Sequence, residues 1–133
     1  LPFLKNNNPP AGAKTTSELK EIIKYAEKPF IIKGIMTING ALKAVEAGAS
    51  AIVVSNHGGR VLDDAMPTAL VLPQIVKAVA GKCLVFVDGG IRSGADIFKA
   101  LALGADGVLI ARPYAVALYG GEKEGIQYLF SFF

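Results

Sequence analysis

The stretch KGIMTINGALKAVEAGASAIVVS, residues 33–55, recurs as GGIRSGADIFKALALGADGVLIA, residues 89–111, and the two align without gaps. Apolar positions match throughout the alignment, and a repeat of this kind is typical of βα units stacked side by side. A (β/α) barrel, a solenoid and a doubly wound sheet all contain such units. Six of the 23 aligned positions are identical: Gly34/Gly90, Ile35/Ile91, Lys43/Lys99, Ala44/Ala100, Gly48/Gly104 and Ala49/Ala105.

The same alternation of helix and strand extends outward from the repeat. Thr15 and Glu18 have the spacing of a capping box ahead of helical apolar spacing, and glycines follow several predicted helices. The predicted strands are short and continuously apolar, which is typical of parallel strands covered by helices. We predict strands at 30–33, 51–55, 84–88 and 107–111, and helices at 15–27, 37–47, 68–80, 94–103 and from near Pro113.

The fold class that these elements predict is α/β, and we favour a barrel. No G-x-G-x-x-G follows the first strand, which argues against a doubly wound dinucleotide-binding sheet. A complete (β/α)8 TIM barrel takes roughly 200–250 residues, so four parallel strands with covering helices predict half of one. The Asn-, Pro- and Gly-rich residues 1–14 are predicted to be a loop or linker, and residues 15–133 the half-barrel. Because the chain starts at Leu1 and stops in YLFSFF, we expect both ends to be cut from something longer.

Composition narrows the function classes. Hydrophobic residues make up 52% and charged residues 19% of the 133, as in a globular chain with a core. The net charge of +3 is scattered, which argues against a nucleic-acid partner. No apolar run reaches the roughly 18 residues of a membrane span, so no membrane partner is expected. One cysteine, Cys83, excludes a disulfide framework and favours a reducing, cytoplasmic setting. One histidine beside that single cysteine argues against a zinc or di-metal site.

Polar residues follow all four predicted strands. The strand ends carry Lys33-Gly34, Ser55-Asn56-His57-Gly58-Gly59-Arg60, Asp88-Gly89-Gly90-Ile91-Arg92 and Ala111-Arg112. In barrels the carboxyl ends of the strands meet at one rim, where the chemistry gathers. Loops are polar in any case, and the chain's only histidine, His57, has an alternative interpretation as a core residue satisfied by a neighbour. The agreement of all four ends favours a functional site.

The third and fourth strand ends indicate an anion site. Gly89, Gly90 and the peptide at Ala111 can present backbone N–H groups, and the helices that follow direct their positive ends the same way. Arg92 and Arg112 add positive charge and forked hydrogen-bond donors. Barrels often bind phosphate after their last two strands, so if these are the last two, the pattern predicts a ligand that carries a phosphate.

The segments FIIKGI, VVSNHGGRVLD and FVDGGIRSGADIFKALALGADGVLIARP now identify a resemblance. They resemble the FMN-dependent α-hydroxy acid oxidase and dehydrogenase family, which includes glycolate oxidase, lactate oxidase and flavocytochrome-type lactate dehydrogenase. The resemblance covers residues 29–121 and corresponds to the C-terminal half of the family's (β/α)8 barrel. It implies FMN as the cofactor.

The resemblance also implies roles for individual residues. Lys33 would lie against the N1/O2 edge of the flavin, and Ser55 would contact the flavin. His57 would be the catalytic base that removes a proton from the substrate, and Arg60 would pair with the substrate carboxylate. The residues implied to hold the ribityl chain and phosphate of FMN are Asp88, Gly89, Gly90, Ile91, Arg92, Ala111 and Arg112.

The sequence departs from the family pattern in two residues and in length. Val61 stands where the family usually has Gln, and Ala111 stands where it usually has Gly. The change at Ala111 keeps the backbone N–H. The first half of the barrel is absent, and with it go the family's substrate-binding tyrosines and the carboxylate that partners the histidine.

We therefore expect part of an enzyme that oxidises a small L-2-hydroxy acid, similar to lactate or glycolate, to the 2-keto acid. The expected partners are the substrate, a missing N-terminal half or second chain, and further copies in a homo-oligomer. One alternative is a non-catalytic or partner-dependent half-barrel that binds FMN or phosphate. Another is an FMN-dependent isomerase or an IMP dehydrogenase-like barrel, against which the His57–Arg60 pair and the lack of a loop cysteine both argue.

Overall fold

The computed structural model describes residues 12–133 and confirms the predicted alternation of helices and strands. Residues 12–14, the described part of the predicted loop or linker at 1–14, have no regular structure; the rest of that prediction lies outside the described residues. The elements, in chain order, are α1 (Thr16–Ala26), β1 (Ile31–Ile35), α2 (Ile38–Ala47), β2 (Ala51–Val54), the short 3-10 helix η2 (His57–Gly59), α3 (Thr68–Val79), β3 (Leu84–Val87), α4 (Gly94–Ala102), β4 (Gly107–Val108) and α5 (Arg112–Phe130).

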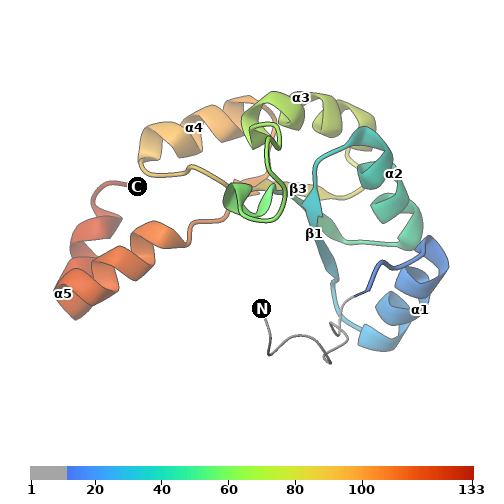
Figure 1. Cartoon of the computed structure of the whole chain (residues 1–133), viewed down its shortest axis with the longest axis horizontal. Helices are drawn as coiled ribbons and strands as arrows, with labels where there is room; N and C mark the ends of the chain where they lie inside the picture. The colour runs from blue at the N-terminus through green and yellow to red at the C-terminus, as the bar shows by residue number, and fades with distance from the viewer. Residues whose placement is uncertain (1–11) are drawn as a thin grey trace.

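The four strands form one parallel sheet in the order β1-β2-β3-β4. Each neighbouring pair is joined by a helix, as parallel pairing requires. Helices α1 to α4 follow one another along the convex side of an arch, and the opposite side of the sheet has no covering helix (Figure 1). This arrangement confirms the prediction of four parallel strands with covering helices, and it leaves the carboxyl ends of all four strands at one edge.

The core lies between the sheet and α2, α3 and α4. Alternate strand residues such as Ile52, Val54 and Val87 point toward the helices and are almost fully buried. They pack against Leu72 and Ile75 of α3 and against alanines of α2. Small residues on α2 let that helix approach the sheet closely, which is why an apolar pattern rich in alanine suffices for a compact core.

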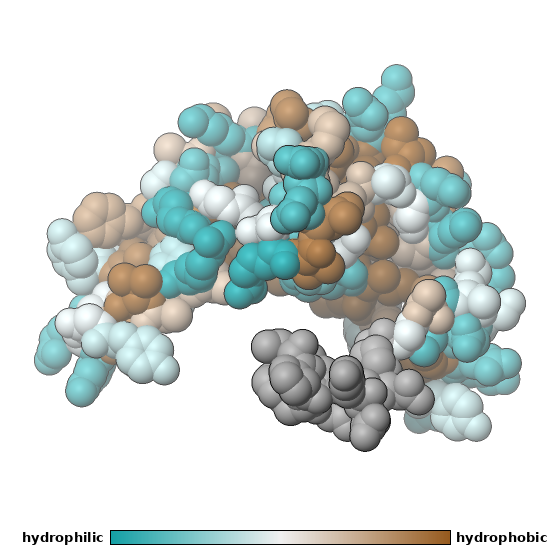
Figure 2. Space-filling model, in the orientation of Figure 1, coloured by the Kyte–Doolittle hydropathy of each residue, from teal (hydrophilic) through white to brown (hydrophobic). Residues whose placement is uncertain are grey.

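The other face of the sheet is apolar and open. Figure 2 shows hydrophobic side chains along the concave side of the arch. A hollow of about 460 Å³ lies there, lined by Ile31, Lys33, Val53, Phe86, Gly107, Val108 and Leu109. Strand residues alternate between the two faces, so this is the face to which Lys33 belongs.

The structure differs from the predicted bounds most at the fourth strand. We predicted 107–111, whereas β4 ends at Val108. β4 is an edge strand with a single neighbour, so only β3 can extend its ladder. One further bond, from Leu109 N to Val87 O at 2.9 Å, follows the strand before the chain turns into α5.

The predicted helix signals are confirmed with small shifts. Thr15 and Glu18 form both bonds of the capping box at the start of α1, and Gly48 ends α2 with a left-handed φ of 94°. At the end of α3 the left-handed residue is Ala80, with φ 51°, one position before the predicted Gly81. Both residues have positive φ, so the turn uses them in succession.

Helix α5 begins at Arg112, next to the predicted Pro113, and is interrupted in its middle. Gly121 and Glu122 leave helical geometry, and Gly125 lies against the backbone of Ala117 in the preceding half. The chain therefore folds back as a helical hairpin. Its end is tied to the start of α4 by a hydrogen bond of 2.8 Å from Gly94 N to Phe132 O.

Candidate active site

A cavity of about 550 Å³ opens at the carboxyl ends of the four strands. Every strand end contributes to its wall, as the topology requires. The cavity brings together all the predicted site residues except Ser55, which is buried beside it. Its lining consists of Lys33, His57, Gly58, Arg60, Asp88, Gly89, Gly90, Ile91, Arg92, Leu109, Ile110, Ala111 and Arg112.

A chain of polar contacts lies across the first three strand ends. Lys33 Nζ lies 3.0 Å from Asp88 Oδ2 and donates to Ser55 Oγ at 2.9 Å. The strand register explains why these three side chains lie together. Lys33 pairs with Val53, and Val53 pairs with Phe86. Ser55 and Asp88 each lie two residues after those partners, so they face the same side of the sheet as Lys33. Ser55 Oγ also accepts from His57 N at 3.1 Å. One lysine therefore connects the two strands that carry the polar loops.

Asp88 provides a test of whether a ligand fits. Its backbone oxygen accepts from Thr68 Oγ1 at 2.8 Å, and its Oδ2 faces Lys33. Its other oxygen, Oδ1, is buried and has no hydrogen-bond partner among the described residues. Buried acceptors are normally satisfied, so this oxygen suits a hydroxyl donor from a bound molecule. The ribityl chain of FMN offers such donors, so the residues present fit that group.

His57 stands at the start of η2, at the mouth of the cavity. Asn56 caps the turn by accepting from Gly58 N at 3.0 Å, and it also donates to Met66 O at 3.2 Å. His57 has a left-handed φ of 57°, and its side chain is exposed. The alternative of a buried, satisfied core histidine is therefore wrong. An exposed imidazole beside a cavity is free to exchange a proton with a bound substrate.

Arg60 follows His57 by one turn. Its Nε donates to His57 O at 3.4 Å, and its side chain reaches the cavity. Within residues 12–133, the ion pairs are Lys20–Glu46 and Lys33–Asp88. Arg60, Arg92 and Arg112 therefore face the cavity without a carboxylate partner in the described part of the chain. Three unpaired guanidinium groups suit a ligand and substrate that are both anionic.

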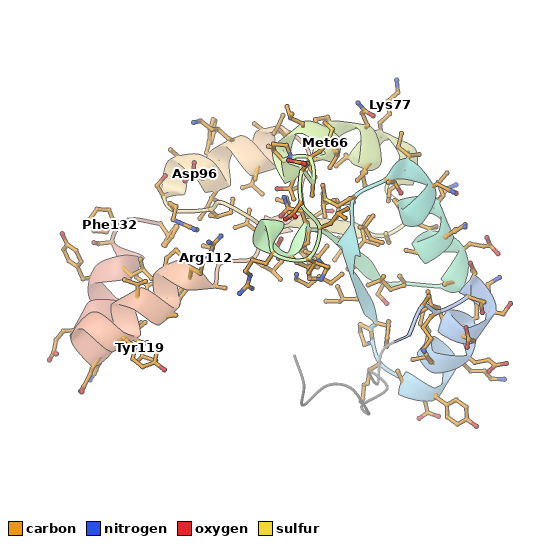
Figure 3. All side chains as sticks on the ribbon, in the orientation of Figure 1. Met66, Lys77, Asp96, Arg112, Tyr119 and Phe132 are labelled. Carbon is orange, nitrogen blue, oxygen red and sulfur yellow. The ribbon has the colours of Figure 1, made fainter. Side chains whose placement is uncertain are left out.

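The glycines of the third strand end shape the predicted phosphate site. Gly89 and Gly90 have φ of 91° and 84°, and a side chain on Gly90 would meet nothing within 4 Å. Open backbone of this kind can approach an anion closely. Figure 3 shows Arg112 at the start of α5 and close to the η2 loop. Its Nη2 lies 3.5 Å from the position that a Cβ on Gly58 would occupy, so the fourth strand end reaches across to the second.

Asp96 contributes to the site in a way that the sequence analysis missed. Its carboxylate accepts from Arg92 N and from Ser93 Oγ, both at 3.0 Å. The bond from Arg92 N, then that from Ser93, lowers the pKa of Asp96 below its ordinary value. Asp96 thus holds the backbone of Arg92 and the hydroxyl of Ser93 in place just before α4, and Gly94 N at the start of α4 is bonded to Phe132 O. An acidic residue in the third position of a helix is the sequence signal that could have revealed it.

Three further contributors were missed as well. Thr68 and Asn56 hold the strand-end loops through the contacts described above, and a Cβ on Gly89 would lie 3.4 Å from Thr68 Oγ1. Gly34 lies against the imidazole of His57. A glycine within an apolar strand indicates a bulge or a close backbone approach, and this signal was available.

No group of three or more His, Cys, Asp or Glu side chains within 12–133 is placed to hold a metal ion. No helix in this range is long and apolar enough to cross a membrane.

The chain is similar to several known proteins. The model of the family described as FMN-dependent dehydrogenase matches residues 6–133. A 4-hydroxymandelate oxidase of Amycolatopsis orientalis is 49% identical over 118 residues, which is 88% of this chain and 33% of that protein. An L-lactate oxidase of Nostoc sp. is 47% identical over 129 residues, covering 97% of this chain and 34% of the relative.

Solved structures extend the likeness to three dimensions. A mandelate oxidase crystal structure with (S)-4-hydroxymandelic acid has a TM-score of 0.86 and 46% identity, over 91% of this chain and 34% of that one. The fold described here is thus part of a barrel, as we predicted. The chain spans about a third of the length of the curated relatives it matches, somewhat less than the half that its four strands suggest.

Proposed function

Because the chain belongs to the FMN-dependent dehydrogenase family, we propose that it supplies the FMN-phosphate site and the catalytic groups of a 2-hydroxy acid oxidoreductase. The substrate is a small L-2-hydroxy acid similar to lactate or glycolate, and the product is the 2-keto acid. The observation that carries the proposal is one cavity that holds the lysine, the histidine and three arginines that have no carboxylate partner within residues 12–133.

The residues that would hold FMN come from all four strands or their carboxyl ends. The backbone of Gly89 and Gly90, with Arg92 and Arg112, would surround the phosphate, and Ala111 would contribute its backbone N–H. Asp88 Oδ1 would accept a hydrogen bond from the ribityl chain, since this oxygen is buried and has no partner within residues 12–133. Lys33 would contact the N1/O2 edge of the flavin, and its ammonium group is oriented by Ser55 Oγ, to which it donates. Bound FMN would accept the two electrons and the second hydrogen that leave the substrate, while His57 takes the first proton.

His57 and Arg60 act on the substrate. Arg60 binds the carboxylate, a task suited to a forked guanidinium. His57 removes one proton from the substrate, and its exposed ring is within the cavity wall. Their separation by two glycines at positive φ keeps the space between them clear of side chains.

The substitution His57→Gln tests the proposal in the intact enzyme that carries this sequence. Flavin absorbance should persist, because FMN stays bound, while its bleaching by lactate or glycolate without oxygen should be lost. General-base catalysis typically contributes about 10²–10⁴-fold, so a drop of that size is expected. Lys77→Gln is the control, since Lys77 lies on the convex side (Figure 3). Undiminished bleaching in His57→Gln would refute the role of the base.

A second candidate is a partner-dependent half-barrel that binds FMN without catalysis. The open concave face of the sheet favours it. Titration of the 133-residue chain with FMN, followed by addition of a 2-hydroxy acid, separates the two. Binding without bleaching supports the second candidate.

Assembly and location belong to the proposal as well. We propose a homo-oligomer without nucleic-acid partners, located in the cytoplasm. A missing N-terminal half or a second chain would cover the open face of the sheet. The single Cys83 is part-buried, and burial raises the pKa of its thiol, which keeps it unreactive. Sedimentation velocity tests the oligomer, and cell fractionation tests the location.

A further inference from the structure

A bulge interrupts the pairing of β1 with β2 beside the site. Lys33 pairs with Val53 and Ile35 pairs with Val54, so Gly34 is the extra residue between them. Gly34 has φ of 96°, a left-handed conformation that side chains rarely adopt. Bulges of this kind re-aim neighbouring side chains and are frequent next to active sites. The bulge here sets Lys33 into the cavity and turns the backbone of Gly34 toward η2.

The imidazole of His57 occupies the space that this backbone leaves. A Cβ on Gly34 would lie 2.7 Å from His57 Cε1 and 3.5 Å from His57 Nε2. Real Cβ atoms essentially never approach another heavy atom that closely. The ring is the free end of an exposed side chain, so a methyl group on Gly34 would displace the ring more readily than the strand.

We propose that Gly34 is a positioning residue, which holds the His57 imidazole at the cavity mouth by having no side chain. His57 is fixed from two sides: its backbone N–H donates to Ser55 Oγ at 3.1 Å, and its ring rests on the backbone of Gly34. The catalytic meaning of this contact rests on the proposed function, whereas the contact itself does not. A displacement of about 1 Å can cost about 10²-fold in rate.

The only histidine of the chain makes the contact directly measurable. In the unmodified protein, NMR should show a nuclear Overhauser effect between His57 Hε1 and the Gly34 α-protons. In Gly34→Ala the His57 Hε1 and Cε1 resonances should shift. Absence of the effect in the unmodified protein, or unchanged resonances in Gly34→Ala, would overturn the proposal.

Gly81→Ala is the matched control. Gly81 also has positive φ, 74°, but a Cβ there would meet nothing within 4 Å. Both variants carry backbone strain, so both should lower the melting temperature, but only Gly34→Ala should move the His57 resonances.

If Gly34→Ala does not fold, the double variant Gly34→Ala/His57→Ala shows whether the His57 ring is the cause. Recovered folding of the double variant supports a clash between the added methyl group and the ring. A double variant that still does not fold assigns the loss of folding to backbone strain and overturns the proposal.

Kinetics of the FMN-loaded enzyme complete the test. Gly34→Ala should reduce the rate of flavin reduction about 100-fold with FMN still bound, and Gly81→Ala should leave the rate unchanged. Equal rates in Gly34→Ala and the unmodified enzyme would contradict the positioning role. If neither protein oxidises a 2-hydroxy acid although the NMR results hold, the proposed function fails and the contact stands.

Discussion

At the scale of single residues, the site depends on one cation with two partners. Lys33 contacts Asp88 and Ser55 at the end of otherwise apolar strands. A lysine in this place would be costly without them, because a part-buried charge needs a partner. The same contacts aim its ammonium group into the cavity. Lys33 was predicted to end its strand, whereas it lies in the middle of β1 and still lines the site.

The Lys33–Asp88 pair is expected to couple energetically. Lys33→Met keeps the apolar stem but leaves the Asp88 carboxylate unpaired, and Asp88→Asn in that background removes the unpaired charge. Urea unfolding of the unmodified chain, Lys33→Met, Asp88→Asn and the double variant should give a coupling energy of about 0.5–1 kcal/mol. The coupling is expected to be this small because the Lys33 side chain is 41% exposed. The more exposed Lys20–Glu46 pair, taken through Lys20→Met and Glu46→Gln, should couple less. Equal coupling in both pairs would contradict the special environment of Lys33.

Asp96 is expected to make stability depend on acid. Hydrogen bonds from Arg92 N and Ser93 lower its pKa in the folded chain, so the folded state binds this proton less readily than the unfolded state. The contribution is therefore present above the ordinary value of 3.8 and is lost as the pH falls through the lower folded value. Asp96→Asn should be less stable than the unmodified chain at neutral pH, and its stability should fall less on acidification. Asp63→Asn, in an exposed loop, is the control, and an unchanged acid slope in Asp96→Asn would refute the role of its hydrogen bonds.

At the scale of elements, the caps of the helices fix the positions at which the neighbouring strands begin and end. Every βα loop at the rim starts from a strand of two to five residues, so a shift of one residue would turn the polar side chains to the other face. Caps such as Thr37 at α2 and the left-handed Gly48 at its end hold the helices in register with these strands. The positions of the polar residues at the strand ends therefore depend on where the neighbouring helices begin and end.

The end of α3 allows the contribution of one helix cap to stability to be measured. Ala80 is left-handed with φ 51°, which costs roughly 1–2 kcal/mol for a residue with a Cβ. Ala80→Gly should therefore raise the free energy of unfolding by up to about 1 kcal/mol after the entropy cost of glycine. Ala78→Gly, inside the same helix, should lower it by about 1 kcal/mol. Thermal and urea unfolding measure both, and a loss of stability in Ala80→Gly would contradict the left-handed cap.

At the scale of the whole molecule, the cavity is a property of the sheet's topology. Residues as far apart in sequence as Lys33 and Arg112 line it, because four parallel strands end at one edge. Figure 3 shows the labelled Arg112 and Asp96 on the two helices that follow the last two strands. A ligand that binds there contacts residues from β1 to the start of α5.

FMN binding should therefore stabilise the whole fold. A ligand present at 100 times its Kd adds about 2.7 kcal/mol to the free energy of unfolding, so the melting temperature should rise with FMN concentration. Riboflavin, which lacks the phosphate, should raise it less. Arg112→Ala should reduce the difference between the two flavins, and Lys77→Ala should preserve it. An equal effect of riboflavin and FMN on the unmodified chain would contradict the phosphate site.

The sequence by itself determined the order of elements, the parallel sheet and which strand end each predicted site residue follows. The repeat and the glycine caps are local signals that can be read from the sequence. Successive βα units place their strands side by side and parallel, so the carboxyl ends of the strands lie at one edge of the sheet. The short β4, the left-handed Ala80 and the hairpin in α5 were not predicted, since each depends on which neighbour the backbone finds.

Only the tertiary structure decided how the site's residues touch. That Lys33 lies between Asp88 and Ser55, that Asp88 keeps one buried oxygen free, and that the His57 ring rests on Gly34 are distances across strands. Spacing along the chain predicts which strand end a residue occupies. Register and the bulge in β1 set which atoms meet, because contacts across a sheet depend on pairing and not on sequence separation.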